Sequence, residues 1–214
     1  MEEALTVKQK QYLEQPKERI SGSEAVVRCL LAEGVDILYG YPGGAIMPVY
    51  DELYKYQDKI HHVLTRHEQG ATHAAQGYAR ISGKVGVAMA TSGPGATNLI
   101  TGIADAQIDS TPIVCITGQV ASHLLGRDAF QETDIIGIST PVTKWNHQIT
   151  KASQIPEVIA KAFYIARSGR PGPVLIDITK DAQFEEFDFQ YKKCTGVRSY
   201  IPVPKIDESK LNTA

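Results

Sequence analysis

Short apolar stretches alternate with longer amphipathic or alanine-rich stretches along most of this chain. Two of the short stretches, 113–116 and 174–176, are apolar at every position, which is typical of strands that are buried on both faces of a sheet. Longer stretches such as 68–82 and 154–168 precede them and have the length of helices. This alternation predicts an α/β fold, an open parallel sheet of about six strands with helices on both faces.

Capping and turn-forming residues mark where these elements begin and end. Ser21 with Glu24 fits a capping box at the start of the first helix, and Gly34 suits its end. We expect strands at 35–39, 60–65, 85–90, 112–117, 143–149 and 174–178, and further helices at 46–56, 68–82, 96–107 and 154–168. Residues 118–133 are expected to form a loop.

The alternating pattern covers residues 19–180, which we interpret as one domain with a sizeable core. Residues 1–18 are polar and are expected to be a flexible or weakly helical lead-in. Residues 181–214 are polar and contain Pro202 and Pro204, so they predict a linker toward a central domain that is absent from this chain.

The composition argues against several classes of protein. The formal net charge is −2 and the basic residues are scattered, which favours neither nucleic acid nor an anionic membrane as a partner. No stretch has the length of a membrane span and no signal sequence opens the chain, so we expect a cytoplasmic protein. Cys29, Cys115 and Cys194 have no metal-binding or redox spacing, and we expect Cys29 and Cys115 to be reduced, buried thiols.

Four predicted strand ends carry unusual residues. In an open α/β sheet, ligands bind outside the carboxyl ends of the strands, which lie along one edge when the sheet is parallel. The four junctions are 40–45 (GYPGGA), 66–70 (RHEQG), 91–98 (TSGPGATN) and 117–119 (TGQ). Glycine-rich turns before a helix favour a phosphate ligand, but these lack the other residues of a nucleotide or dinucleotide loop. Taken singly, each turn is better explained as a tight strand–helix connection.

Glu68 is the residue at this edge that points most directly to a chemical function. It follows a predicted strand at the start of a helix and is surrounded by small residues. One interpretation is an ordinary first-turn acid that the helix dipole favours. The neighbouring glycine turns favour another, a partly buried carboxylate that exchanges a proton or hydrogen-bonds a ring nitrogen.

Several of these motifs resemble one known family. Residues 66–71 (RHEQGA), 77–80 (GYAR) and 91–98 resemble the amino-terminal domain of thiamine diphosphate-dependent decarboxylases and carboligases. Residues 40–46 (GYPGGAI) and 129–134 (AFQETD) narrow the resemblance to the biosynthetic acetohydroxyacid synthases. The resemblance runs from about residue 20 to residue 179.

The resemblance implies a role for each site residue. Glu68 would be the catalytic acid that hydrogen-bonds N1′ of the cofactor's aminopyrimidine, and the imino tautomer that this favours removes the C2 proton of the thiazolium. Pyruvate is then decarboxylated and joined to a second 2-keto acid, giving 2-acetolactate or 2-aceto-2-hydroxybutyrate for branched-chain amino acid synthesis. The implied cofactor-binding residues, besides Glu68, are Gly43, Gly44, Ala45, Pro94 and Asn98.

Three further residues are implied to lie near the substrate channel, namely Phe130, Gln131 and Lys144. An ordinary loop residue is the alternative interpretation of Gln131, and a solvated strand lysine is that of Lys144. The chain departs from the family pattern at 121–123 (ASH) and at Gln76, which stands where a glutamate is common. These departures concern channel shape or helix packing and leave the interpretation of Glu68 unchanged.

The resemblance also implies cofactors and partners. Thiamine diphosphate is the cofactor, while Mg²⁺ and FAD are expected in the full-length enzyme and mainly outside this chain. The partners would be a second copy of the protein, whose diphosphate-binding domain completes each cofactor site, and a regulatory small subunit. The substrates would be small 2-keto acids.

Two alternative functions stay open at this point. Another thiamine diphosphate decarboxylase or oxidase, such as a catabolic acetolactate synthase, a pyruvate oxidase or an oxalyl-coenzyme A decarboxylase, would carry the same residues around Glu68. A stand-alone flavodoxin-like binding module would share the fold without the chemistry.

The isolated 214-residue chain is expected to have no synthase activity, because it would hold only half of each cofactor site. A turnover assay for acetolactate with pyruvate, thiamine diphosphate and Mg²⁺ checks this. Acetolactate formation by the isolated chain would contradict the prediction.

Overall fold

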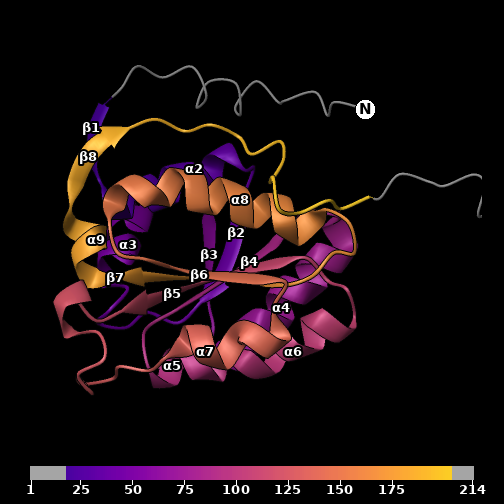
Figure 1. The fold of residues 1–214 in the computed structure, drawn as a ribbon, viewed down its shortest axis with the longest axis horizontal. Helices are drawn as coiled ribbons and strands as arrows, with labels where there is room; N and C mark the ends of the chain where they lie inside the picture. The colour runs from indigo at the N-terminus through magenta and orange to yellow at the C-terminus, as the bar shows by residue number, and fades with distance from the viewer. Residues whose placement is uncertain (1–17, 204–214) are drawn as a thin grey trace, which may run out of the picture.

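The computed structural model describes residues 18–203, and its centre is a sheet of six parallel strands (Figure 1). The strand order is β3-β2-β4-β5-β7-β6. The strands are β2 (Ile37–Gly40), β3 (His61–Leu64), β4 (Gly86–Ala90), β5 (Ile113–Gln119), β6 (Trp145–Ile149) and β7 (Val174–Thr179). Every pairing in this sheet is parallel, which confirms the predicted fold class.

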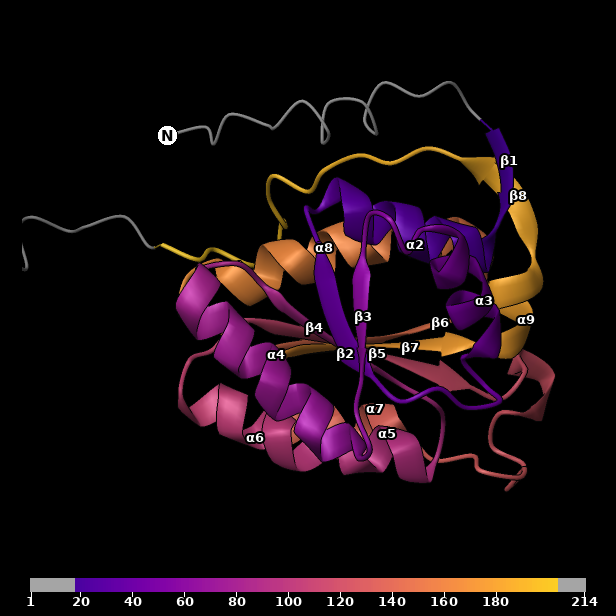
Figure 2. The same cartoon turned by 180° about the vertical axis from the view of Figure 1, so that it is seen from behind.

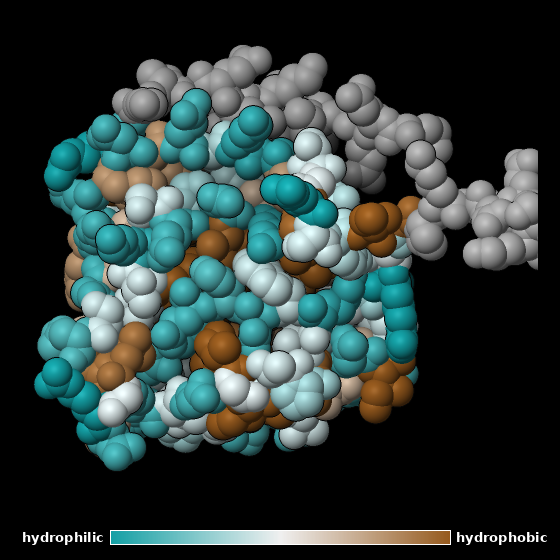
Figure 3. Space-filling model, in the orientation of Figure 1, coloured by the Kyte–Doolittle hydropathy of each residue, from teal (hydrophilic) through white to brown (hydrophobic). Residues whose placement is uncertain are grey.

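Helices cover both faces of the sheet, as the two views in Figures 1 and 2 show. One face carries α2 (Gly22–Ala32), α3 (Met47–Lys55) and α8 (Ile155–Arg167). The other carries α4 (Glu68–Ser82), α5 (Pro94–Asn98), α6 (Ile100–Ile108) and α7 (Ile135–Ser139). Each face therefore has its own buried apolar cluster. On the side seen in Figure 3, polar residues interrupt the apolar ones, so no broad apolar band crosses that side.

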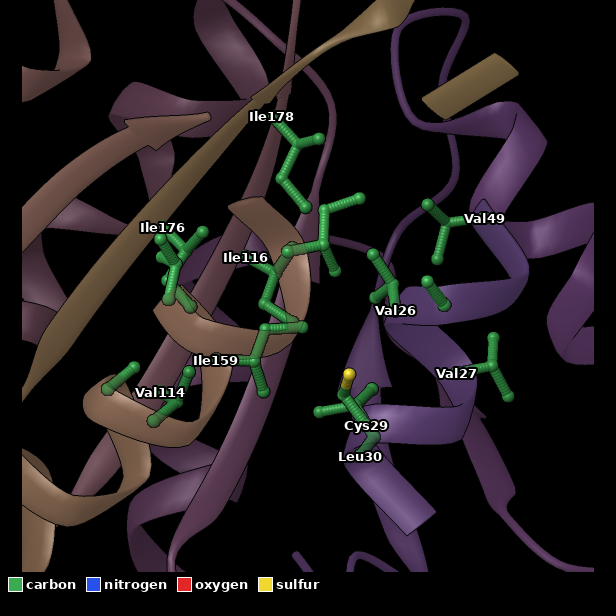
Figure 4. Packing of buried hydrophobic residues seen from close by; sticks show 14 of the residues in the cluster. Val26, Val27, Cys29, Leu30, Val49, Val114, Ile116, Ile159, Ile176 and Ile178 are labelled. Atoms are coloured by element: carbon green, nitrogen blue, oxygen red, sulfur yellow. The ribbon is translucent and has the colours of Figure 1, made fainter. Parts of the chain in front are cut away.

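The first core lies between the sheet and helices α2 and α8. Figure 4 shows side chains of α2, including Val26 and Leu30, facing Ile116 of β5 and Ile176 of β7, with Ile159 of α8 beside them. All five side chains are buried. At the start of α2 the side chain of Ser21 accepts a hydrogen bond from the N–H of Glu24, as the predicted cap requires.

The second core is built from small residues, which let α4 lie close to β4 and α6. A methyl group on Gly102 of α6 would clash with the Thr72 hydroxyl oxygen of α4. Gln76, at the position where the family often has a glutamate, donates to the carbonyl of Gly102 at 2.9 Å. Ala71 and Ala75 are fully buried here, so these small residues serve packing within the chain.

Several element boundaries agree with the prediction, and α4 has the bounds expected for it. The predicted helix at 96–107 is wrong in detail, because it starts at Pro94 and is divided at Leu99. The N–H of Leu99 donates three residues back, to Ala96, and this local tightening separates α5 from α6. The predicted loop at 118–133 is also partly wrong, because β5 extends to Gln119 and a 3₁₀ turn, η1, spans Ser122–Leu124.

The interpretation of residues 181–214 as a linker stays a prediction, but the part of this segment that the structure describes has regular structure that the sequence did not indicate. Lys180–Phe184 forms α9, and β8 (Glu186–Phe189) pairs antiparallel with β1 (Glu18–Ser21). Further along, the Tyr191 hydroxyl donates to the buried carboxylate of Glu33. Partners that are more than 150 residues away hold this segment, so local composition could not reveal its structure. The domain division at Lys180 stays a prediction. Of the predicted lead-in at 1–18, Glu18 belongs to β1, while residues 1–17 and residues 204–214 lie outside the described residues.

The buried cysteines match expectation. Cys29 and Cys115 are free and fully buried, and burial raises the pKa of both thiols. Cys194 is free and partly exposed. Within residues 18–203, none of the helices has both the length and the apolar character that crossing a membrane requires.

Replacing Phe163 tests the importance of the first core. Phe163 of α8 is 1% exposed, so Phe163→Ala is expected to lower the free energy of unfolding by about 3–5 kcal/mol through lost burial and a new cavity. Phe184→Ala is the matched control, because Phe184 is 63% exposed and its loss should cost less than about 0.5 kcal/mol. Urea denaturation measures both variants, and equal losses would contradict the assignment of this core.

Candidate functional site

The strand order changes direction between β2 and β4, and this opens a ligand site at the carboxyl ends of the two strands. β2 connects through α3 to β3 on one side, and β4 connects through α5 and α6 to β5 on the other. Because α3 and α5 lie on opposite faces of the sheet, the chain leaves β2 and β4 in opposite directions, and open α/β sheets bind their ligands at such a point. These are the two glycine-rich junctions that the sequence analysis singled out.

Glu68 lies at this edge as the first residue of α4. The ring of His67 caps the helix by accepting a hydrogen bond from the N–H of Gln69 at 3.0 Å. Glu68 is 8% exposed, and its Oε2 accepts a hydrogen bond of 3.0 Å from the amide of Asn98. The helix start favours the negative charge, while the neutral amide orients the carboxylate without neutralising it. The structure thus brings Glu68 and Asn98 together.

The turn before α5 passes directly beside this carboxylate. Gly93 has φ +56°, a conformation that side chains rarely adopt. At Gly95 a methyl group would lie 3.2 Å from Glu68 Oε1 and 2.8 Å from Thr91 Cγ2. Glycine therefore allows the backbone to approach Oε1, the oxygen that Asn98 leaves free. Pro94 is exposed at the start of α5 in the same turn.

The loop after β2 is joined to the loop after β4. The N–H of Ala45 donates to the hydroxyl of Thr91 at 3.2 Å, and the carbonyl of Ala45 accepts from the side chain of Gln183 at 2.7 Å. Gly43 is packed against Thr91, whereas Gly44 is exposed with open space where a side chain would be. All three predicted residues of this turn lie at the end of β2, and Gly43 and Ala45 contact Thr91 in the turn after β4.

A third loop, between β5 and α7, reaches the same turn. A methyl group on Gly93 would lie 2.6 Å from the carbonyl oxygen of Gln131, so the two backbones are in contact. Phe130 beside it is 87% exposed. The carboxylate of Glu132 accepts hydrogen bonds from the N–H groups of Gly126, Arg127 and Ala129, and these bonds lower the pKa of Glu132. Hydrogen bonds within the loop therefore join residues 126–129 to Glu132, and Phe130 and Gln131 lie between them at its tip.

Lys144 does not join these residues, which corrects the expectation that it lies with the substrate-channel residues. It precedes β6, at the amino end of the parallel sheet. Its ammonium group donates to the carbonyls of Ile165 and Ser168 at the end of α8 and to the hydroxyl of Tyr200. A cation at a helix C-terminus stabilises the last carbonyl groups, and this use explains Lys144.

Asp177 is the most deeply buried acid near the site, and the sequence analysis missed it. It is fully buried in β7 and accepts hydrogen bonds from Thr117 at 2.7 Å, Gln119 at 3.1 Å and Gln148 at 2.9 Å. None of the Lys, Arg or His residues in the described part of the chain pairs with it. Burial raises its pKa to about 6 against the effect of the three donors. A single acid in the apolar stretch 174–178 was the available signal.

Tyr50 was also missed. Its hydroxyl is buried without a hydrogen-bond partner and lies against Gly40 at the end of β2, where a methyl group would clash with it. Burial, and then the charge of Glu68, raise its pKa. The only signal for Tyr50 in the sequence is its place in an amphipathic helix, and that pattern is typical of core residues.

The arrangement suits a flat heterocycle that can share a proton. A shielded carboxylate has one oxygen that Asn98 leaves free, and the backbone beside this oxygen carries no side chain at Gly95. Within residues 18–203, no group of three His, Cys, Asp or Glu side chains is placed to bind a metal ion.

Comparison with known proteins gives two consistent findings. The family profile described as "Thiamine pyrophosphate enzyme, N-terminal TPP binding domain" matches residues 20–138. The acetolactate synthase large subunit of Corynebacterium glutamicum is 58% identical over 186 residues, which are 87% of this chain and 30% of that protein. The acetolactate synthase large subunit of Lactococcus lactis is 56% identical over 161 residues, which are 75% of this chain and 28% of that protein.

A third relative, a probable acetolactate synthase large subunit of Methanocaldococcus jannaschii, is 56% identical over 171 residues. These residues are 80% of this chain and 29% of that protein. The chain therefore spans about a third or less of the length of these relatives.

Asp177 predicts a specific pH dependence of stability. Its pKa rises from an ordinary 3.8 to about 6 on folding, so the stability that its protonated form contributes is fully present below about pH 4 and is lost as the pH rises through about 6. This loss should reach about 3 kcal/mol at most. The measurement is urea unfolding from pH 4 to pH 7 for the natural protein and for Asp177→Asn, which cannot titrate. Parallel pH profiles of the two proteins would contradict the prediction.

Proposed function

Because the chain belongs to the thiamine pyrophosphate enzyme family and matches its N-terminal TPP binding domain, we propose that it forms the pyrimidine-binding part of an acetolactate synthase. The full protein would decarboxylate pyruvate and join the two-carbon unit to a second 2-keto acid. The products would be 2-acetolactate or 2-aceto-2-hydroxybutyrate, and the pathway branched-chain amino acid synthesis.

The observation that carries the proposal is the environment of Glu68. Its carboxylate is 8% exposed, is oriented through Oε2 by Asn98, and has Oε1 beside the backbone of Gly95. A side chain at Gly95 would fill the space next to Oε1. A flat aminopyrimidine ring fits a site of this kind, because it needs one carboxylate oxygen and a smooth surface to lie against.

Thiamine diphosphate, when bound, supplies a nucleophilic carbon and an electron sink for decarboxylation. Glu68 holds a proton in a hydrogen bond to the pyrimidine nitrogen N1′, and the low exposure of the carboxylate keeps water from competing for that bond. Asn98 keeps Glu68 in one orientation. Gly43, Gly44, Ala45 and Pro94 line the pyrimidine pocket from the two glycine-rich turns.

Phe130 and Gln131 contact the 2-keto acid from the loop above the turn. Support for this role is the contact between the Gln131 backbone and Gly93, which lies two residues from Gly95. The amide of Gln131 can hydrogen-bond a carboxylate or ketone, while Phe130 shields the reacting groups from water.

The remaining components belong to the full-length protein, of which this chain spans about 30% in its relatives. We propose that Mg²⁺ and FAD bind mainly outside this chain, and that a second copy completes each cofactor site. A regulatory small subunit is a further proposed partner, suggested by the words "large subunit" in the names of the relatives. A cytoplasmic location follows from the same biosynthetic role.

Replacing Glu68 tests the proposed function. In the full-length gene product, Glu68→Gln is expected to lower thiamine diphosphate-dependent acetolactate formation about a hundred-fold or more, because an amide cannot hold the proton at the ring nitrogen. Product analysis with pyruvate alone and with added 2-ketobutyrate measures the activity and identifies the second substrate.

Glu157→Gln is the matched control, because Glu157 is exposed in the first turn of α8 and should tolerate the change. Thermal unfolding should be similar for the two variants. Full activity of Glu68→Gln, or no acetolactate from the natural protein, would refute the proposal.

A further inference from the structure

The loop at 120–134, which carries Phe130 and Gln131, is attached to the rest of the domain by hydrogen bonds at both of its ends. At its start, the N–H of Ser122 donates to the carboxylate of Asp181 at 2.9 Å. At its end, the amide of Gln119 donates to the carbonyl of Thr133 at 3.0 Å. Between these two attachments, the backbone of Gln131 contacts Gly93 in the glycine turn beside Glu68.

Gln119 connects the loop to a charge in the interior of the sheet. The same amide nitrogen that donates to Thr133 also donates to Asp177 at 3.1 Å, while the side-chain oxygen accepts from the N–H of Val120 at 2.9 Å. Gln119 is 1% exposed, so neither hydrogen bond can readily be exchanged for one to water. Both the nitrogen and the oxygen of the Gln119 amide therefore have partners, and these hydrogen bonds fix the orientation of the side chain.

We propose that Gln119 is a positioning residue, which uses the buried carboxylate of Asp177 to hold Thr133 and thereby sets where Phe130 and Gln131 stand above the cofactor turn. This inference rests on the proposed function, because it assigns the substrate contacts to Phe130 and Gln131. A hydrogen bond to an ionised carboxylate is stronger than one between neutral groups. The carboxylate of Asp177 therefore anchors the amide, and the amide holds the loop.

Gln148 is the comparison that separates a positioning role of Gln119 from mere hydrogen bonding to Asp177. It donates its amide to the same oxygen of Asp177, Oδ2, at 2.9 Å, but it lies in β6 and makes no hydrogen bond to the loop at 120–134 within the described chain. A role confined to the stability of Asp177 would make Gln119 and Gln148 equivalent. A positioning role makes Gln119 alone important for the substrate.

The experiment compares Gln119→Met with Gln148→Met in the full-length gene product. Methionine has a similar length and removes one amide donor from Asp177 in each case. For Gln119→Met we expect the KM for pyruvate to rise about five-fold or more, as the loss of one hydrogen bond to the loop implies. For Gln148→Met the KM should change less than about two-fold, and both variants should bind thiamine diphosphate like the natural protein.

A second variant guards against misfolding of Gln119→Met. In the double variant Gln119→Glu with Asp177→Asn, the introduced amide at position 177 can donate to position 119, and the introduced carboxylate can still accept from the N–H of Val120. Gln148, which donates to the same atom of Asp177, has to turn its amide so that its oxygen accepts instead. The carbonyl of Thr133 then faces an acceptor and has no donor. We expect a raised KM in a protein that still unfolds cooperatively, and a normal KM in this variant would overturn the proposal.

Hydrogen–deuterium exchange separates this inference from the proposed function. Amides at 126–134 should exchange about ten-fold faster in Gln119→Met than in Gln148→Met, whatever reaction the enzyme performs. If the natural protein forms no acetolactate, the proposed function fails and exchange alone decides. Equal exchange or equal KM in the two single variants would show that Gln119 only supports the core.

Discussion

The reversal of strand order between β2 and β4 is the constraint on which the rest of this structure depends. Because α3 and α5 leave neighbouring strand ends on opposite faces, the chain departs from that edge in two directions without an insertion or a long loop. The two glycine-rich turns follow these strands and meet at Thr91, and α4 begins beside them. A site at this position is therefore a product of topology, and the side chains there specify what it binds.

Amides, rather than cations, hold the two important acids. Asn98 orients Glu68, and Gln119 with Gln148 donates to Asp177. An amide fixes the direction of a carboxylate and leaves its charge in place, whereas a lysine or arginine would largely neutralise it. For Glu68 this keeps one oxygen available for a ligand. For Asp177 burial raises the pKa to about 6, and the amide donors act against this rise because they favour the charged form.

The site is also layered in depth. In the proposed site, Glu68 and the glycine turns would contact the ligand, while the backbone of Gln131 contacts the turn at Gly93, and Asp177 lies in the sheet and is linked to this loop through Gln119. Ser122 ties one end of the upper loop to Asp181 at the start of α9, and the carbonyl of Thr133 ties the other end to Gln119, which also donates to Asp177 of β7. A change at Asp177 can therefore move the loop that carries Phe130 and Gln131, although Asp177 itself would not contact the ligand.

The sequence by itself determined the fold class, the number of parallel strands and the position of Glu68, because hydrophobic periodicity and glycine turns are local signals. It also singled out both glycine-rich junctions, since parallel strands must end at one edge. Only the tertiary structure decided the rest. Lys144 caps α8, β8 pairs with β1, and Asp177 meets Gln119, because each depends on contacts between residues more than 20 positions apart that no local pattern encodes.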